Sequence, residues 1–263
     1  MRGLESLEKF RVEIDGHVAT VTITAPPVNA QGTRFRQEIV RIFDVLGLAR
    51  DVRAIVLTGE GKAFSAGADL SERSAIADAP DGYARHNRLV RAAFDVVMEC
   101  PKPVIAAVNG AASGLGADTA LACDFIIASE WASFTWSYIH RGIIPDGGGM
   151  YFLPRRVGLA KAKDLIFTGR KVEADEALAL GIVDRKTTAD RLLADAQAWA
   201  AELGRGSATA LALSKTILNQ TFELPAQQVF AQGSQAQGIC YTSTEHRESV
   251  RAFLAKTHGT AGE

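Results

Sequence analysis

The sequence has few of the residues that mark metal proteins and disulfide-bonded proteins. Its 263 residues include only three cysteines, Cys100, Cys123 and Cys240, which are far apart and form no CxxC pair. We interpret them as buried thiols of a protein in a reducing compartment. The five histidines are scattered without an HxxxH pair, so the sequence predicts no metal site.

An excess of charge and long hydrophobic runs are also missing. Twenty-nine basic residues balance thirty acidic ones, and the formal net charge of -1 gives no long-range field for nucleic acid or an anionic membrane. No apolar run approaches the length of a membrane span, and the N-terminal "MRGLESLEKF" lacks the apolar segment of a signal peptide. We therefore expect a cytoplasmic protein that binds neither nucleic acid nor membranes.

The residues that are present favour one large α/β domain, because 47% of the chain is hydrophobic. Apolar residues alternate on both sides of an Asp-Gly turn over residues 10–23, which predicts a β-hairpin. Residues 33–49 place apolar side chains at helical spacing, with Thr33 as the expected N-cap.

Further along the chain, three short apolar runs are bounded by turn residues and separated by helix-like segments. Runs of this kind, at 54–59, 104–110 and 124–129, are typical of parallel strands buried on both faces. After Gly158 the pattern is helical almost to the end of the chain. The sequence thus predicts a β-rich core followed by a helical C-terminal third.

Two glycine-rich loops follow two of these predicted strands. The first contains "FSAGADL"; the second, "NGAASGLGAD", leads directly into a predicted helix. Such loops leave backbone N–H groups free to bind an oxyanion, and the positive end of the helix dipole favours this at the second loop. One loop of this type alone would more simply be a tight turn. Two loops, each ending in Ala-Asp, favour a binding role.

Other glycine and serine motifs are incomplete. "GLGAD" lacks the full GxGxxG pattern and no lysine follows it, which excludes a standard dinucleotide fingerprint and a P-loop. The GxSxG nucleophile motif needs glycine two positions before and two positions after the serine. Ser113 has Ala111 and Leu115 there, so this motif is absent as well.

Four segments together resemble the enoyl-CoA hydratase/isomerase (crotonase) superfamily: "KAFSAGADL", "PVIAAVNGAASGLGADTALACDFIIAS", "GIIPDGGGMYFLPRRVG" and "TGRKVEADEALALGIVD". The resemblance extends from "PPVNA" to "AFLAK" near the end. It implies an α/β fold, a crotonase-like spiral of ββα units over residues 1–200, with a helical C-terminal region over 201–263 for trimerisation and CoA cover. It also implies a homotrimer or a dimer of trimers.

The resemblance implies acyl-CoA thioesters as substrates, with coenzyme A as part of the substrate and no separate cofactor. It assigns the two oxyanion-hole donors to the backbone N–H groups of Ala68 and Leu115, which would stabilise an enolate. Ala66 and Leu70 correspond to backbone that meets the adenine of CoA. Asp69, between them, is assigned to the same substrate-binding segment and is also expected to cap the helix that follows.

Near the C-terminus, Phe253 and Lys256 resemble an aromatic residue and a lysine that help hold CoA, often from a neighbouring subunit. A core phenylalanine and a solvated lysine are the alternatives for these two positions.

The acid–base residues depart from the hydratases of this family, which use two glutamates. Asp118 stands at the first position and Tyr138 at the second. A tyrosine is no general base at neutral pH without a large pKa shift, so Tyr138 remains a candidate for substrate binding. Asp146, in "GIIPDGGG", stands where double-bond isomerases and a dienoyl isomerase have a catalytic aspartate. The alternatives are a helix cap for Asp146 and a buried structural role for Asp118.

The sequence therefore predicts an enzyme of the enoyl-CoA hydratase/isomerase type, a lyase or an isomerase acting on enoyl-CoA. Asp146 would move a proton, and Asp118 would orient a water or take a second proton. The missing second glutamate favours isomerisation over hydration. The alternative is a non-catalytic CoA-ester-binding or scaffolding trimer of the same fold; RNA binding, found in one type of relative, is disfavoured by the balanced charge.

Overall fold

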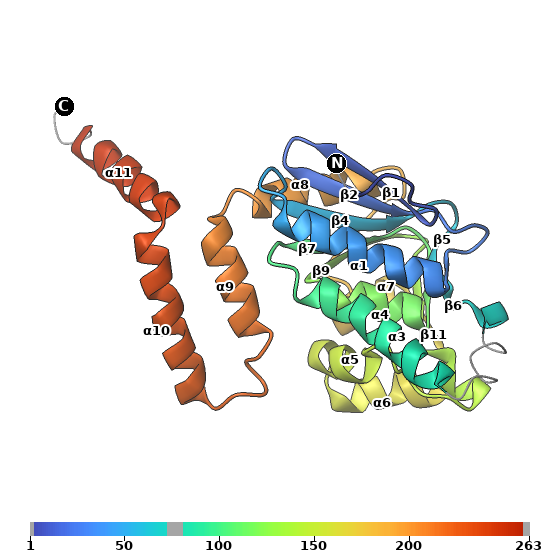
Figure 1. The fold of residues 1–263 in the computed structure, drawn as a ribbon. Helices are drawn as coiled ribbons and strands as arrows, with labels where there is room; N and C mark the ends of the chain where they lie inside the picture. The colour runs from blue at the N-terminus through green and yellow to red at the C-terminus, as the bar shows by residue number, and fades with distance from the viewer. Residues whose placement is uncertain (1–2, 73–80, 260–263) are drawn as a thin grey trace.

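The fold is built on a six-stranded sheet in the order β1-β2-β4-β7-β9-β12 (Figure 1). It comes from a computed structural model that describes residues 3–72 and 81–259. β1 (Phe10–Asp15) and β2 (Val18–Ile23) pair antiparallel, which confirms the predicted hairpin. β2 then pairs parallel with β4 (Ala54–Gly59), in a register that places Val18 opposite Ala54.

The three predicted parallel strands are confirmed and are neighbours in this sheet. They are β4, β7 (Val104–Val108) and β9 (Phe125–Ser129). Their side chains alternate between two hydrophobic clusters, as the period of a strand requires. In β4, Ile55 and Leu57 face the larger cluster, whereas Val56 faces the smaller one beneath α8 (Leu192–Leu203). Both faces of the sheet are therefore covered, which explains the continuous apolar runs.

A second sheet gives the fold its spiral form. It has four strands in the order β11-β10-β8-β5, with bounds Lys171–Glu173, Ser133–Thr135, Ala111–Ser113 and Ala63–Ser65. Along the chain, a strand of the large sheet is followed by a strand of the small sheet and then by a helix. Three such turns are β4-β5-α3 (Gly82–Met98), β7-β8-α4 (Leu115–Ala122) and β9-β10-α5 (Gly149–Val157). The ββα spiral is thus confirmed.

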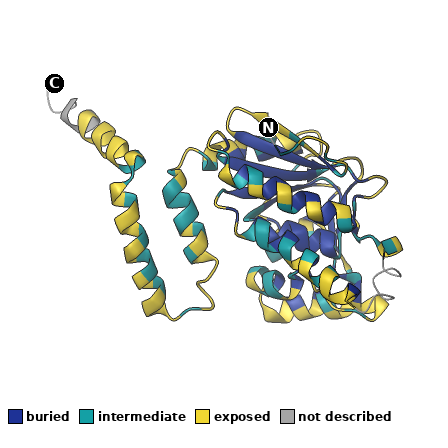
Figure 2. Cartoon of the chain, viewed as in Figure 1, coloured by how far each residue is buried: buried dark blue, intermediate teal, exposed yellow. Residues whose placement is uncertain are grey.

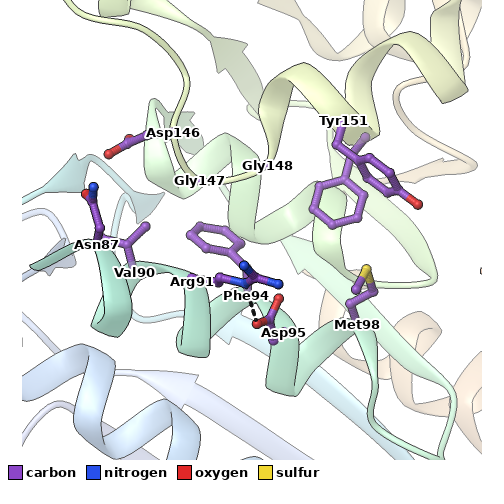
Figure 3. A pocket seen from close by; sticks show the side chains of 11 residues that line it. Asn87, Val90, Arg91, Phe94, Asp95, Met98, Asp146, Gly147, Gly148 and Tyr151 are labelled. Carbon is purple, nitrogen blue, oxygen red and sulfur yellow. Dashed lines mark hydrogen bonds and ion pairs between the residues drawn. The ribbon is translucent and has the colours of Figure 1, made fainter. Parts of the chain in front are cut away.

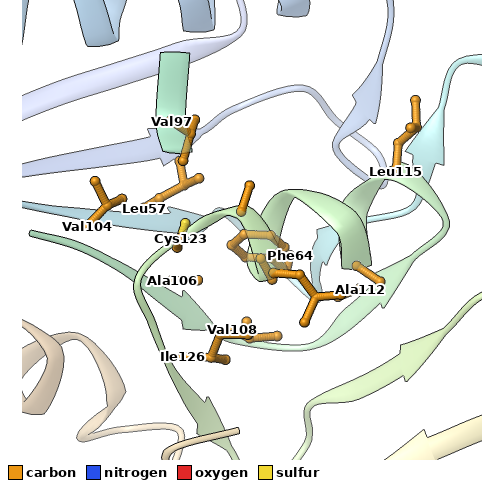
Figure 4. Packing of buried hydrophobic residues seen from close by; sticks show 14 of the residues in the cluster. Leu57, Phe64, Val97, Val104, Ala106, Val108, Ala112, Leu115, Cys123 and Ile126 are labelled. Carbon is orange, nitrogen blue, oxygen red and sulfur yellow. The ribbon is translucent and has the colours of Figure 1, made fainter. Parts of the chain in front are cut away.

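The larger cluster lies between the sheets and the helices that cover them. Figure 4 shows Leu57, Val104 and Ala106 from the large sheet beside Phe64 and Ala112 from the small one, all fully buried. Leu115, at the first turn of α4, lies at the edge of this cluster. The first turn of α4 is therefore packed firmly against the core.

Two local predictions about the N-terminal half and the cysteines are wrong. Helix α1 (Thr33–Leu48) has Gly32, not Thr33, at its N-cap. Thr33 is the first helical residue, and both its N–H and its hydroxyl donate to the Glu72 carboxylate, at 2.8 and 2.7 Å. The carboxylate of Glu72, 39 positions along the sequence, therefore accepts the hydrogen bonds that a capping side chain would accept. Of the cysteines, Cys100 and Cys123 are buried as predicted, but Cys240 is only half-buried.

The region after Gly158 is mainly helical, as predicted, but it contains two strands that the sequence did not reveal. β11 joins the small sheet and β12 (Arg185–Thr187) joins the edge of the large one beside β9. Each has three residues, too few to show a period of two. The helices of this region before the C-terminal arm are α6 (Leu159–Thr168), α7 (Ala174–Leu180) and α8.

The last three described helices form an arm beside the core (Figure 1), here called the C-terminal arm. They are α9 (Ala208–Leu218), α10 (Ala226–Thr242) and α11 (Thr244–Gly259). Neither α9 nor α10 contains a buried residue, in contrast to the core (Figure 2). Lys215 anchors the arm, because its Nζ lies 2.7 Å from the Asp124 carboxylate, and both side chains are mostly buried. No described helix could cross a membrane.

Candidate active site

The two glycine-rich loops meet in the structure. A Cβ atom added to Gly67 would lie 2.4 Å from the carbonyl oxygen of Ser113 and 3.1 Å from the backbone nitrogen of Leu115. Gly67 also has a φ of 87°, which other residues rarely adopt. Only glycine therefore allows the first loop to lie directly against the second.

The predicted backbone donors line one cavity of about 300 Å³, here called the loop cavity. Ala68 ends β6 (Gly67–Ala68), and Leu115 begins α4, so the N–H of Leu115 has no partner within its helix. The positive end of the α4 dipole points the same way. Ala66, Leu70 and Tyr138 line the same cavity. The structure thus brings together five of the predicted site residues.

Asp118 lies behind this cavity, fully buried. Its carboxylate accepts hydrogen bonds from Trp136 Nε1 at 2.9 Å and from the Tyr138 hydroxyl at 2.7 Å, and a further one from the Gly149 N–H. Burial raises the pKa of Asp118 to about 7, although the three donors favour the ionised form. Because this carboxyl is fully buried, direct contact between Asp118 and a water molecule would require the surrounding side chains to move.

The hydrogen bond between Tyr138 and Asp118 means that Tyr138 cannot act as a general base. Burial, followed by the charge of Asp118 and the hydrogen bond to it, raises the pKa of the Tyr138 hydroxyl far above its usual range. Tyr138 is therefore a neutral group whose hydroxyl hydrogen is directed at Asp118.

The buried Asp118 carboxyl predicts a pH dependence of stability. Its folded-state pKa lies above the 3.8 of an unperturbed aspartate, so the folded state binds more protons than the unfolded state between these two pH values. Its contribution to stability is fully present below about pH 4 and is lost as the pH rises through about 7, with an upper limit of about 4 kcal/mol. We expect the free energy of unfolding, measured with urea, to fall between about pH 4 and pH 7. The Asp118→Asn variant should lack this fall. The same dependence of unfolding free energy on pH in both proteins would contradict a raised pKa of Asp118.

Asp146 occupies a different environment: it is exposed and lines a second cavity of about 520 Å³, here called the α3–α5 cavity (Figure 3). A helix-capping role is excluded, because α5 has Gly148 at its N-cap and no side-chain cap. A Cβ atom added to Gly147 would lie 2.4 Å from Leu115 Cδ2 and 2.8 Å from the Phe94 ring. Gly147, the next residue after Asp146, therefore packs against the side chain of Leu115, the predicted second backbone donor of the loop cavity.

The remaining predicted site residues lie elsewhere. Asp69 accepts hydrogen bonds from the Ser71 N–H at 3.0 Å and the Ser71 hydroxyl at 2.6 Å, and so caps the short helix η1 (Leu70–Glu72), as expected. Phe253 is 69% exposed on α11, which Figure 1 shows beyond α10 and away from the core. Lys256 is on the same helix, and its side chain lies outside the described residues.

Comparison with known proteins identifies the family of this chain. Residues 13–260 match the sequence profile of the family described as "Enoyl-CoA hydratase/isomerase". The chain belongs to the enoyl-CoA hydratase/isomerase family. A probable enoyl-CoA hydratase of Rhizobium meliloti is 37% identical over 252 residues, which cover 95% of this chain and 96% of the relative.

Solved structures of the enoyl-CoA hydratase/isomerase family agree with the fold. The enoyl-CoA hydratase of Bacillus anthracis superimposes with a TM-score of 0.88 at 32% identity, covering 95% of this chain and 97% of that one. A putative enoyl-CoA hydratase of Streptomyces coelicolor A3(2) gives 0.90 at 33% identity, over 96% and 93% of the two chains. The crotonase-type fold is therefore secure.

Two buried residues that interact with the predicted site residues were missed in the sequence. Trp136 is fully buried and donates to Asp118, but nothing in "SFTWSYIH" distinguishes it from a core tryptophan. Arg36 is only 3% exposed, and its Nε has no hydrogen-bond partner among the described residues. Burial lowers the pKa of its guanidinium, while the charges of Glu72, Asp146 and Asp69 oppose this effect. Charge patterning cannot reveal a cation buried by tertiary packing.

Proposed function

We propose that this protein moves the double bond of an enoyl-CoA thioester through an enolate. The thioester oxygen would lie in the loop cavity against the N–H groups of Ala68 and Leu115. Negative charge develops on this oxygen when a proton leaves Cα, and preorganised donors stabilise it without reorganising during the reaction. The closeness of the two loops at Gly67 supports this placement.

One contrast between carboxylates carries the proposal. Asp118 is fully buried, and its carboxylate accepts hydrogen bonds from Trp136 and Tyr138. Asp146 is exposed in a cavity whose neighbouring lining residue, Gly147, packs against Leu115. Asp146 would accept the Cα proton of a 3-enoyl-CoA and return a proton to Cγ, so the product keeps the composition of the substrate. Hydration would also need a group to activate water, and Asp118 with Tyr138 is poorly arranged for that.

The experiment is to incubate the protein in deuterated water with a 3-enoyl-CoA and, separately, a 2-enoyl-CoA, and to measure product masses. We expect migration of the double bond in the first to be faster than addition of water to the second. Rapid hydration without migration would contradict the proposed reaction and would mean that Asp118 and Asp146 act as a two-carboxylate pair. Binding without turnover of either substrate would favour the non-catalytic scaffold.

We also propose that the C-terminal arm joins copies of the chain into a trimer or a pair of trimers. The arm exposes large apolar side chains that a monomer would leave in water, namely Leu218, Phe222, Phe230, Ile239, Tyr241, Val250, Phe253 and Leu254. Such an assembly would also give Phe253 a route to a neighbouring CoA site. Measurement of the mass in solution tests this proposal.

A further inference from the structure

The α3–α5 cavity is elongated along one face of α3. Asn87, Val90, Phe94 and Met98 recur at helical spacing on that face, and eleven helical steps separate the first from the last, or about 16 Å. Figure 3 shows Asp146 near Asn87 at one end and Tyr151 near Met98 at the other. An acyl chain whose reacting carbons lie at Asp146 would extend along this row toward Tyr151.

A second cavity of about 510 Å³, with a more polar lining, begins where the α3–α5 cavity ends. Tyr151 and Met98 line both cavities, and the second is otherwise lined by polar and charged residues that include Lys215, Asn219 and Glu223. An acyl chain gains free energy for each methylene that it removes from water against apolar atoms, but not against such groups. The boundary at Tyr151 thus separates a favourable from an unfavourable path.

The Tyr151 ring is held in place by the C-terminal arm. Its hydroxyl donates to the Glu223 carboxylate at 2.9 Å, and Glu223 lies in the connection between α9 and α10. The Arg155 guanidinium lies 3.5 Å from the centre of the Tyr151 ring and also contacts Glu223. The Phe152 ring packs edge-on against Tyr151 with centroids 5.2 Å apart. A side chain held at its hydroxyl and its ring cannot swing aside at little cost.

We propose that Tyr151 is a specificity-determining residue that sets the maximum length of the acyl chain. The chain would occupy the α3–α5 cavity and stop at the Tyr151 ring, which the C-terminal arm holds as the end wall. This inference rests on the proposed acyl-CoA function and names its substrate class: acyl-CoA esters with an unbranched apolar tail of limited length.

The test measures binding of saturated acyl-CoA esters, from butanoyl- to hexadecanoyl-CoA, by calorimetry. In the unaltered protein, affinity should rise about fourfold for each added methylene until the tail reaches Tyr151, and then stop rising. Tyr151→Ala should move this limit to longer tails and raise the affinity ratio of long over short esters about tenfold. Tyr151→Phe, which keeps the ring, should retain the original limit.

Two further variants make the test decisive. Met98→Ala opens the same end of the cavity and keeps the backbone carbonyl that accepts from Asn219 Nδ2 at 3.1 Å, so it should also move the limit even if Tyr151→Ala folds poorly. Trp131→Ala removes an exposed aromatic side chain in the turn after β9 and should leave the limit unchanged. An unchanged limit in both Tyr151→Ala and Met98→Ala would overturn the inference. Saturated esters do not react, so their binding is independent of the proposed reaction. A moved limit without any enoyl-CoA turnover would contradict the proposed reaction but support the role of Tyr151.

Discussion

Asp146→Asn is expected to lower the turnover of an enoyl-CoA by about 10²–10⁴ while leaving the affinity for the thioester nearly unchanged. The amide has almost the shape of the carboxylate but cannot accept the Cα proton. Because Asp146 caps no helix and is exposed, the substitution should not disturb the fold. Single-turnover rates and acyl-CoA binding, measured on the same preparation, separate the chemical step from binding.

Asp95→Asn is the matched control for this experiment. Asp95 lines the same cavity, but it lies about two helical turns along α3 from Asn87 and forms an exposed ion pair with Arg91 at 3.1 Å (Figure 3). We expect its turnover to stay within about twofold of the unaltered protein, since an exposed pair contributes little. Near-normal turnover of Asp146→Asn would transfer the proton step to another group, with Asp118 the first to examine.

Leu115→Pro is expected to lower the rate by about 10²–10³, because it removes one of the two backbone donors. The position makes this an unusually clean test. Leu115 is the first residue of α4, where proline is well tolerated because its missing N–H makes no bond within the helix. The preceding residue is Gly114, which is the residue best able to adapt to a following proline.

Leu115→Met is the matched control, because it keeps both the N–H and the volume of a side chain that is only 3% exposed and packs beside Phe94. It should retain most of the activity. Circular dichroism and the denaturation midpoint establish that the proline variant is folded. A folded Leu115→Pro protein with full activity would remove Leu115 from the oxyanion site.

Asp118 and Tyr138 stand at the two positions where the sequence resemblance expects glutamates, and they are hydrogen-bonded to each other. The residue at one position therefore affects what the other can do. Two glutamates facing a substrate can share the handling of a water molecule. Here the Tyr138 hydroxyl donates a hydrogen bond to one oxygen of Asp118, and Trp136 Nε1 donates one to the other oxygen. The carboxyl is fully buried. In the proposed reaction, Asp146 is therefore the carboxylate that would carry the proton.

Much of the fold was predictable from local pattern. The hairpin and the strands β4, β7 and β9 were visible because their apolar runs are long enough to show a period or continuous burial. β11 and β12, with three residues each, carry no such signal and form only because larger sheets offer them an edge. The capping of α1 by Glu72 was equally invisible, because it joins residues 39 positions apart.

The sequence by itself determined the family, the two glycine-rich loops, and the identity of Ala68, Leu115, Asp118 and Asp146 as the residues to consider. These are matters of residue type and order, which resemblance and local backbone preference reveal. Only the tertiary structure distinguishes the environments of the two aspartates, because burial, hydrogen bonding and access to a cavity arise from segments far apart in the chain. The same reason applies to Tyr151, since a residue becomes the end wall of a cavity only when α3, α5 and the C-terminal arm pack around it.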